Sequence, residues 1–453
     1  MSPPAQYADI EIRILERQDE GYPIEITVNH EREFPRGYLD PGFLPWQTGA
    51  DAGQDGDRLF NWLFQDETLR LAWAEVRGSQ PACRIRLRID AGAPELHALP
   101  WEMLQETRIQ QTPVTLAAAM STPFSRYLAG TWQPGGPILK RPLKILVVIP
   151  APKNLAEAGL QPFVVEEEWD NLQGAMSSLV EHGQVELVRL TAPQAAGLRM
   201  RAREGGSVEI QSGSNPPYTL RALEEELKKG YHILHFIGHG SFNVQDGAAL
   251  VVMANADNEV ELVRDADFAA MLARQLADTG QQHDDKLRLV YLDSCASGSR
   301  DTANAFRGFA PALVQAGVPA VIAMQDQTEV RTSQLFSQTF YRQLLDHGLV
   351  DLACNEARSA VLSAQLPGAA IPVLFMRLRN GWLLGQSGAI SSDRAETFWP
   401  FLLENINRGQ CTPFLGPQVL TGLLPDRAAI AAKLAEKYSY PLADREDLAR
   451  VAQ

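Results

Sequence analysis

Several features that would direct a first interpretation are scarce in this chain of 453 residues. It has four cysteines, none in a Cys-x-x-Cys pair, so neither a disulfide framework nor a zinc site is expected. It has no run of eighteen apolar residues, which argues against a membrane-spanning helix. The amino terminus lacks the basic and apolar regions of a signal peptide. Together these absences predict a reduced, cytoplasmic protein.

Positive charge is also scarce: 41 Lys and Arg against 55 Asp and Glu give a net charge of −14. Phosphate backbones repel an acidic chain, so nucleic acid is not the expected partner. No group of His, Cys, Asp and Glu has the spacing of a metal site, and we expect neither a metal nor another cofactor. An apolar fraction of 45% is ordinary for a globular protein, and the length predicts two or three domains.

The first part of the chain, residues 1–135, is predicted to be a β-rich portion. Alternating apolar and polar residues predict strands, whereas apolar residues at helical spacing predict a helix. On these patterns we expect a hairpin at 8–30, a loop at 31–55, a helix at 57–76 and a further strand at 84–90. A Pro/Gly run at 134–142 then indicates a linker.

Residues 140–385 alternate buried strands with amphipathic helices. This order predicts an α/β domain in three layers, with a mainly parallel sheet between helices. One connection, 192–218, is too long for a tight turn, so we expect a hairpin or an accessible loop there. A second linker follows at 386–395, and residues 396–453 begin another module.

Two strands of the α/β domain carry the candidate chemistry. The first starts at Tyr231 and runs into Gly238-His239-Gly240, and the second starts at Leu287 and runs through Cys295. Ligands bind beyond the carboxyl ends of parallel strands, so His239 and Cys295 are expected at the same edge of the sheet. A Cys with a His roughly fifty residues upstream is an arrangement of cysteine proteases.

These segments resemble the CHAT domain, a family of caspase- and separase-like peptidases. The resemblance covers roughly residues 80–385 and rests on four motifs. They are Phe236-Ile-Gly-His-Gly, Tyr291-Leu-Asp-Ser-Cys-Ala-Ser-Gly, Leu96-His-Ala-Leu-Pro-Trp-Glu-Met-Leu and Gly317-Val-Pro-Ala-Val-Ile-Ala-Met-Gln. The resemblance implies a caspase-like fold and a cysteine endopeptidase.

The roles implied for the two strand ends follow from this resemblance. Cys295 is expected to be the nucleophile and His239 the general acid and base. The backbone N–H groups of Gly240 and Cys295 are expected to form the oxyanion hole. The alternatives are that Cys295 is an inert buried thiol and that His235 or His232, and not His239, is the catalytic histidine. His235 and His232 are the other histidines of the first strand, and we expect them to be structural.

Two acidic residues are candidates for substrate binding. Asp293 precedes Cys295 by two residues, where caspase-like families with basic specificity carry an acid at the floor of the specificity pocket. The alternative is that Asp293 caps the helix after Cys295. Asp326, which follows the strand expected at 320–324, is a candidate for a second acidic wall of the same pocket.

Beyond the catalytic domain, Cys411-Thr-Pro-Phe-Leu-Gly-Pro resembles the opening of sirtuin-like modules, where a glycine turn can hold a dinucleotide phosphate. Here Gly416 is followed by Pro-Gln-Val, which departs from the Gly-Ala-Gly of that family. For the whole chain the CHAT resemblance implies a protein substrate, such as one encoded nearby, and an upstream sensor or activator protein. Bacterial defence or signalling is the expected setting. A catalytically silent scaffold that binds partner proteins is the alternative function.

Overall fold

The computed structural model places most of the first 385 residues. It describes residues 7–44, 52–90, 92–106, 113–128, 136–190, 199–202, 208–210, 218–243, 248–277, 286–294, 300–326, 328–378 and 380–385, together with 435 and 437. Met1–Ser387 forms one compact unit and Gly388–Gln453 a second. The sirtuin-like motif falls in the second unit and lies outside the described residues. None of the helices among the described residues is long and apolar enough to cross a membrane.

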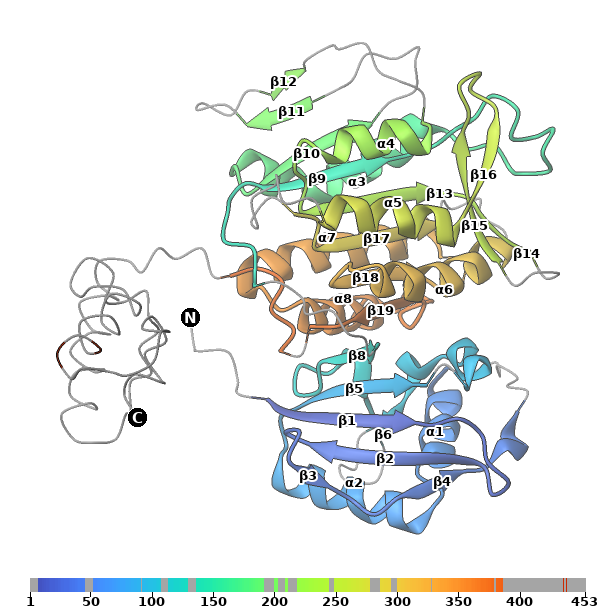
Figure 1. The fold of residues 1–453 in the computed structure, drawn as a ribbon, viewed down its shortest axis with the longest axis vertical. Helices are drawn as coiled ribbons and strands as arrows, with labels where there is room; N and C mark the ends of the chain where they lie inside the picture. The colour runs from blue at the N-terminus through green and yellow to red at the C-terminus, as the bar shows by residue number, and fades with distance from the viewer. Residues whose placement is uncertain are drawn as a thin grey trace. The chain divides into compact units, whose positions relative to one another are not determined.

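Parallel strands form the centre of the first unit (Figure 1). In spatial order they are β10 (Val185–Leu190), β9 (Leu143–Val148), β13 (Ile233–Gly238), β17 (Leu289–Ser294) and β18 (Ala320–Met324). Each of their pairings is parallel. These strands are the continuous apolar runs of the sequence, as expected for strands that are buried on both faces.

Helices cover both faces of this sheet, so the predicted three layers are confirmed (Figure 1). Ile233 and Ile237 of β13 pack towards the face with α3, α7 and α8, whereas Leu234 and Phe236 pack towards α4, α5 and α6. The helices on the first face are α3 (Val165–Glu181), α7 (Val330–His347) and α8 (Val350–Ser363). Those on the second are α4 (Leu220–Leu227), α5 (Asp265–Ala277) and α6 (Arg300–Gln315).

The sheet continues from these central strands into the amino-terminal portion. β19 (Pro372–Met376) pairs antiparallel with β18 and parallel with β8 (Phe124–Tyr127). Beyond β8 the order is β5 (Cys83–Ile89), β1 (Ala8–Ile14), β2 (Tyr22–Val28) and β3 (Arg32–Glu33), and β4 (Gly37–Leu39) pairs with β2. The hairpin expected at 8–30 is therefore confirmed as β1 and β2. The domain boundary expected near residues 135–140 stays a prediction.

Two expectations for the amino-terminal portion were wrong. The helix predicted over 57–76 is two helices, α1 (Ala52–Leu63) and α2 (Glu67–Ser79). Asp66 separates them, because its carboxylate accepts hydrogen bonds from the backbone of Thr68 and Leu69 and caps a new helix. The loop expected at 31–55 contains β3, β4, the 3-10 helix η1 (Pro41–Phe43) and the start of α1.

The connection from β5 to β8 joins two parallel neighbours of the sheet. It contains short elements: η2 (Pro94–Ala98), η3 (Trp101–Met103), β6 (Gln105–Glu106), β7 (Val114–Thr115) and η4 (Leu116–Ala118). The buried carboxylate of Glu102 accepts two hydrogen bonds from Arg126 of β8, with Nη2–Oε2 at 2.6 Å and Nε–Oε1 at 3.0 Å. This ion pair ties the connection to the sheet.

Smaller pieces complete the unit. The long connection at 192–218 contributes β11 (Arg199–Ala202) and β12 (Val208–Ile210), which extend the sheet beyond β10 as an antiparallel hairpin. The remaining residues of 191–217 lie outside the described ranges. A separate antiparallel sheet follows β13, with β14 (Gly240–Asn243), β15 (Ala248–Ala254) and β16 (Val260–Arg264). Within it, β15 and β16 pair antiparallel as a hairpin.

Candidate active site

The register of β13 and β17 brings the two signature segments to one edge of the sheet. Each residue from Ile233 to Gly238 pairs with one from Leu289 to Ser294, and the last pair is Gly238 with Ser294. In the sequence these two residues directly precede His239 and Cys295. Cys295, with 296–299, lies outside the described residues, so the structure describes the histidine side of the site and the strand that leads to the cysteine.

His239 is held in one orientation by its surroundings. The residue is 2% exposed, and its Nε2 lies 2.8 Å from the carbonyl oxygen of Gln161 in the connection between β9 and α3. A carbonyl oxygen only accepts hydrogen bonds, so Nε2 carries the proton and Nδ1 is the basic nitrogen of the neutral ring. The ring of Phe163 packs edge-on against His239, with centroids 5.3 Å apart.

Burial also sets the charge of this histidine. It lowers the pKa of His239 below the ordinary 6.5, because the imidazolium is disfavoured away from water, and the hydrogen bond to Gln161 opposes this in part. The neutral imidazole is therefore favoured near neutral pH. A neutral ring with a defined tautomer can take a proton from a neighbouring group.

The other histidines of β13 and its approach are buried and hydrogen-bonded within the fold. His235 is fully buried, stacks on Tyr291 at 4.4 Å and shares a 2.8 Å hydrogen bond through Nδ1 with the hydroxyl of Tyr341. Burial lowers the pKa of His235 to about 3. The Nδ1 of His232 accepts a 2.8 Å hydrogen bond from the backbone N–H of Lys144, which ties the start of β13 to β9.

Gly240 turns the chain from β13 into a strand of the small sheet. Opposite residues in an antiparallel pair alternate between hydrogen-bonded and non-bonded pairs. The backbone N–H of Val252 donates to the carbonyl of His239 at 3.0 Å, so the adjacent pair, Gly240 with Val251, is of the non-bonded kind. The N–H of Gly240 therefore points away from β15.

Asp293 lies at the end of β17, beside Ile237 of β13. Its Oδ2 accepts a 2.8 Å hydrogen bond from the hydroxyl of Ser333 in the first turn of α7, and the residue is 7% exposed. It lines a cavity of about 30 Å³ between the sheet, α3 and α7, together with Glu168 and Thr328. The alternative of a helix cap stays a prediction, because residues 295–299, between Asp293 and the described part of α6 from Arg300, lie outside the described residues.

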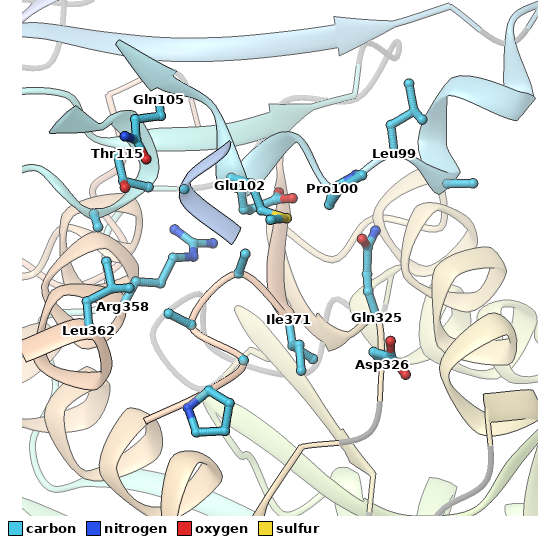
Figure 2. A pocket seen from close by; sticks show the side chains of 18 of the residues that line it. Leu99, Pro100, Glu102, Gln105, Thr115, Gln325, Asp326, Arg358, Leu362 and Ile371 are labelled. Carbon is cyan, nitrogen blue, oxygen red and sulfur yellow. The ribbon is translucent and has the colours of Figure 1, made fainter. Parts of the chain in front are cut away.

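Asp326 is not in this cavity. It is exposed and lines a much larger pocket of about 1000 Å³, which lies between the end of β18, α8 and the crossover from β5 to β8 (Figure 2). We call this pocket the seam groove. The two acidic residues that the sequence suggested for one pocket thus line two different ones.

Sequence reasoning missed three contributors to the site. Gln161 acts through its backbone carbonyl, which no side-chain pattern can indicate. Phe163 lies on the connection before α3 and packs against His239, whereas Ser333 lies at the start of α7 and bonds to Asp293. Only the tertiary structure brings these residues together. In retrospect, the one signal was that both segments follow strands that end at the candidate edge.

No part of the described site has the composition of a metal centre. Within the described ranges no group of three or more His, Cys, Asp and Glu side chains could hold a metal ion. Cys83 and Cys354 are free, buried thiols, and burial raises the pKa of Cys354 to about 12, which keeps it protonated. Neither is suited to be a nucleophile.

The fold and both signatures agree with one family. The model of the CHAT domain matches residues 54–400, and this chain belongs to the CHAT domain family. The predicted caspase-like α/β fold with a mainly parallel sheet is confirmed. No curated protein matches the chain.

Solved cysteine proteases are among the similar structures. A secreted C11 cysteine protease from Bacteroides thetaiotaomicron, in complex with an irreversible peptide inhibitor, has a TM-score of 0.30 and 12% identity over 49% of this chain. The alignment spans 58% of that protease. The complex of the pro- and mature domains of Porphyromonas gingivalis RgpB has a TM-score of 0.38 and 9% identity, over 73% of this chain and 70% of that one. The Saccharomyces cerevisiae separase–securin complex has a TM-score of 0.31 and 13% identity, over 70% of this chain and 17% of that one.

Proposed function

We propose that this protein is a cysteine endopeptidase whose nucleophile is Cys295 and whose general acid and base is His239. The observation that carries the proposal is the pairing of Gly238 with Ser294 at the ends of β13 and β17. One further step of the same parallel register would bring the next residue of each strand side by side. Membership of the CHAT family, with both signatures intact, supports the same pair.

In this mechanism Nδ1 of His239 takes the proton from the Cys295 thiol, and the thiolate attacks the carbonyl carbon of the scissile peptide bond. The tetrahedral intermediate collapses as the imidazolium gives its proton to the leaving amine, which breaks the C–N bond. Water, deprotonated by His239, then hydrolyses the thioester and restores the thiol. Gln161 is a positioning residue, because its carbonyl fixes the tautomer that this sequence of transfers needs.

The backbone N–H groups of Gly240 and Cys295 are the proposed oxyanion hole. The direction of the Gly240 N–H supports this, since Gly240 and Val251 form a non-bonded pair and the N–H points away from β15. Donors fixed in place before the reaction stabilise the developing negative charge without reorganisation.

We assign the basic side chain before the cleaved bond to the carboxylate of Asp293. A guanidinium or ammonium group would find an oriented anion there, held by Ser333. The cavity of about 30 Å³ has room for only one or two waters, so α3 and α7 must separate for the side chain to enter. Asp326 is not assigned to this recognition, because it lines the seam groove and not the Asp293 cavity.

The natural setting of this activity is proposed to be a bacterial defence or signalling system, with a protein substrate and an upstream activator in the cytoplasm. A silent scaffold remains the second candidate function, since a CHAT fold does not by itself require turnover. The requirement that the Asp293 cavity open is consistent with an enzyme that works only when activated.

Labelling with a peptide that ends in an arginyl chloromethyl ketone separates the two functions. We expect one molecule of label on Cys295 of each active chain, identified by mass spectrometry, and no label in Cys295→Ala or His239→Ala. His182→Ala, which changes an exposed histidine, is the matched control and should label as the wild type does. Full peptide cleavage by pure Cys295→Ala protein would refute the assignment, and a wild-type chain that never labels, even in lysate of its source, would favour the scaffold.

A further inference from the structure

The seam groove is a second site that the proposed chemistry does not use. It opens where β18 ends and β19 begins, between α8 and the crossover that carries η2 and η3 (Figure 2). Gln325 and Asp326 follow β18, and Ile371 precedes β19. Its volume of about 1000 Å³ is at the upper end of the range for small-molecule sites, which gather where parts of a structure meet.

Most of the groove wall is apolar. Side chains from the crossover face others from α8 and the segment before β19; they include Leu99, Pro100, Met103, Leu362, Leu366 and Ile371. Leu362 is 46% exposed, so much of its apolar surface is open to a bound molecule. Such a wall favours a ligand with an apolar body.

Arg358 gives the groove a buried positive charge. It projects from α8 towards the part of the groove where Glu102 lies, and it is 1% exposed (Figure 2). Its acceptors are the carbonyls of Pro372 and Ala117 and the side-chain amide of Asn355. Among the described residues none of its partners is a carboxylate. Four hydrogen bonds occupy four of its five N–H groups, which leaves the second N–H of Nη2.

The carboxylate that acts on Arg358, that of Glu102, does not neutralise its charge. Glu102 acts on it electrostatically, but both carboxylate oxygens of Glu102 receive hydrogen bonds from Arg126. Two buried guanidinium groups therefore share one buried carboxylate, which leaves one positive charge in excess. Burial lowers the pKa of Arg358, as expected for a cation without an anion beside it.

The other charges of the groove are at its exposed margin. Arg17, Glu95 and Asp326 line it and are solvent-exposed, so water screens them. Figure 2 shows Asp326 and Arg358 on opposite sides of the groove. An anionic group bound at Arg358 would thus lie away from the carboxylate of Asp326.

We propose that the seam groove binds a small amphipathic anion, with its charged group at Arg358 and its apolar body along Leu99, Pro100 and Ile371. An uncompensated buried charge is costly, and an anion delivered by the ligand removes that cost while the apolar body displaces water from the walls. This site is separate from the Asp293 cavity and does not depend on the proposed peptidase activity.

The experiment uses a matched pair of fluorescent probes with the full chain. Anilinonaphthalene sulfonate has an apolar body and one anionic group, and phenylnaphthylamine has nearly the same body without the charge. We expect the sulfonate to bind roughly tenfold more tightly or better, since a charge-assisted hydrogen bond to a buried group is worth at least this ratio. Leu362→Glu should abolish this preference, because it adds a carboxylate one helical turn after Arg358 on the same face.

The control is Leu71→Glu, which changes another exposed leucine, in α2 and outside the groove wall, and should bind both probes as the wild type does. Arg358→Gln should reduce sulfonate binding at least tenfold while phenylnaphthylamine binding stays. If that variant does not fold, Leu362→Glu carries the test alone. Equal affinity of the wild type for the two probes, or unchanged sulfonate binding in Leu362→Glu, overturns the proposal.

Discussion

The hydroxyl of Ser333 donates a 2.8 Å hydrogen bond to Oδ2 of Asp293, which joins the first turn of α7 to the end of β17. The two residues are forty positions apart in the sequence. Because the bond fixes one carboxylate oxygen, the orientation of Asp293 depends on where α7 begins. Any movement of that helix is therefore transmitted to the acidic group that we assign to substrate recognition.

Asp293→Asn should lower cleavage after arginine by about a hundredfold, because a charge-assisted hydrogen bond contributes roughly 2–3 kcal/mol. Reaction of Cys295 with a small uncharged thiol reagent should change little. The measurement is kcat/KM on fluorogenic peptides that differ only in the residue before the cleaved bond. Asp326→Asn is the matched control, since Asp326 lines the seam groove, and it should keep the preference for arginine. Equal loss toward every peptide and reagent in Asp293→Asn would mean that Asp293 only supports the strand end.

The pH profile should report the burial of His239. Its pKa is lowered by burial, so the acid limb of kcat/KM is expected below pH 6.5. Phe163→Ala exposes the ring to water and should move this limb to higher pH, towards the ordinary value for histidine. Val164→Ala changes the exposed neighbour of Phe163 and should leave the limb in place. A limb that does not move in Phe163→Ala would contradict the role of burial.

The protein should become less stable as the pH is lowered, because of His235. Its pKa is about 3 in the folded protein and near 6.5 when unfolded, so the unfolded chain binds the extra proton between these values. The stability contributed by the neutral ring is complete above pH 6.5 and is lost as pH falls towards 3. In His235→Phe, the change in unfolding free energy between pH 7 and pH 5 should be smaller by about 2 kcal/mol. Urea denaturation at both pH values measures it, and an unchanged difference would contradict it.

Breaking the buried ion pair between Glu102 and Arg126 should lower the free energy of unfolding strongly. Glu102→Ala leaves Arg126 buried without its anion and is expected to lower the free energy of unfolding by about 3–5 kcal/mol. Glu157→Ala, at an exposed position, should change it by less than about 0.5 kcal/mol. Urea denaturation compares the two, and a similar small change in both would show that the pair contributes little.

The local pattern of the sequence was enough for most of the fold. The runs that became β9, β13, β17 and β18 are apolar without interruption, and burial on both faces requires that composition wherever the chain is placed. The same reasoning placed His239 and Cys295 after adjacent strands, since polar residues that follow buried strands meet at one edge of a parallel sheet. Short elements such as β3 and η1 were missed because they bury too few residues to leave a periodic signal.

Tertiary structure decided everything that depends on contacts between distant segments. The sequence could not separate Asp293 from Asp326, because both follow parallel strands, and only the packing of α7 and the crossover puts them in different cavities. The carbonyl of Gln161 orients His239 although any residue supplies a carbonyl, so no residue type could have indicated it. The excess charge at Arg358 likewise exists only in the folded chain, where Glu102 is already occupied by Arg126. Residue type gives each group its chemistry, whereas its partners, and hence its charge and direction, come from the fold.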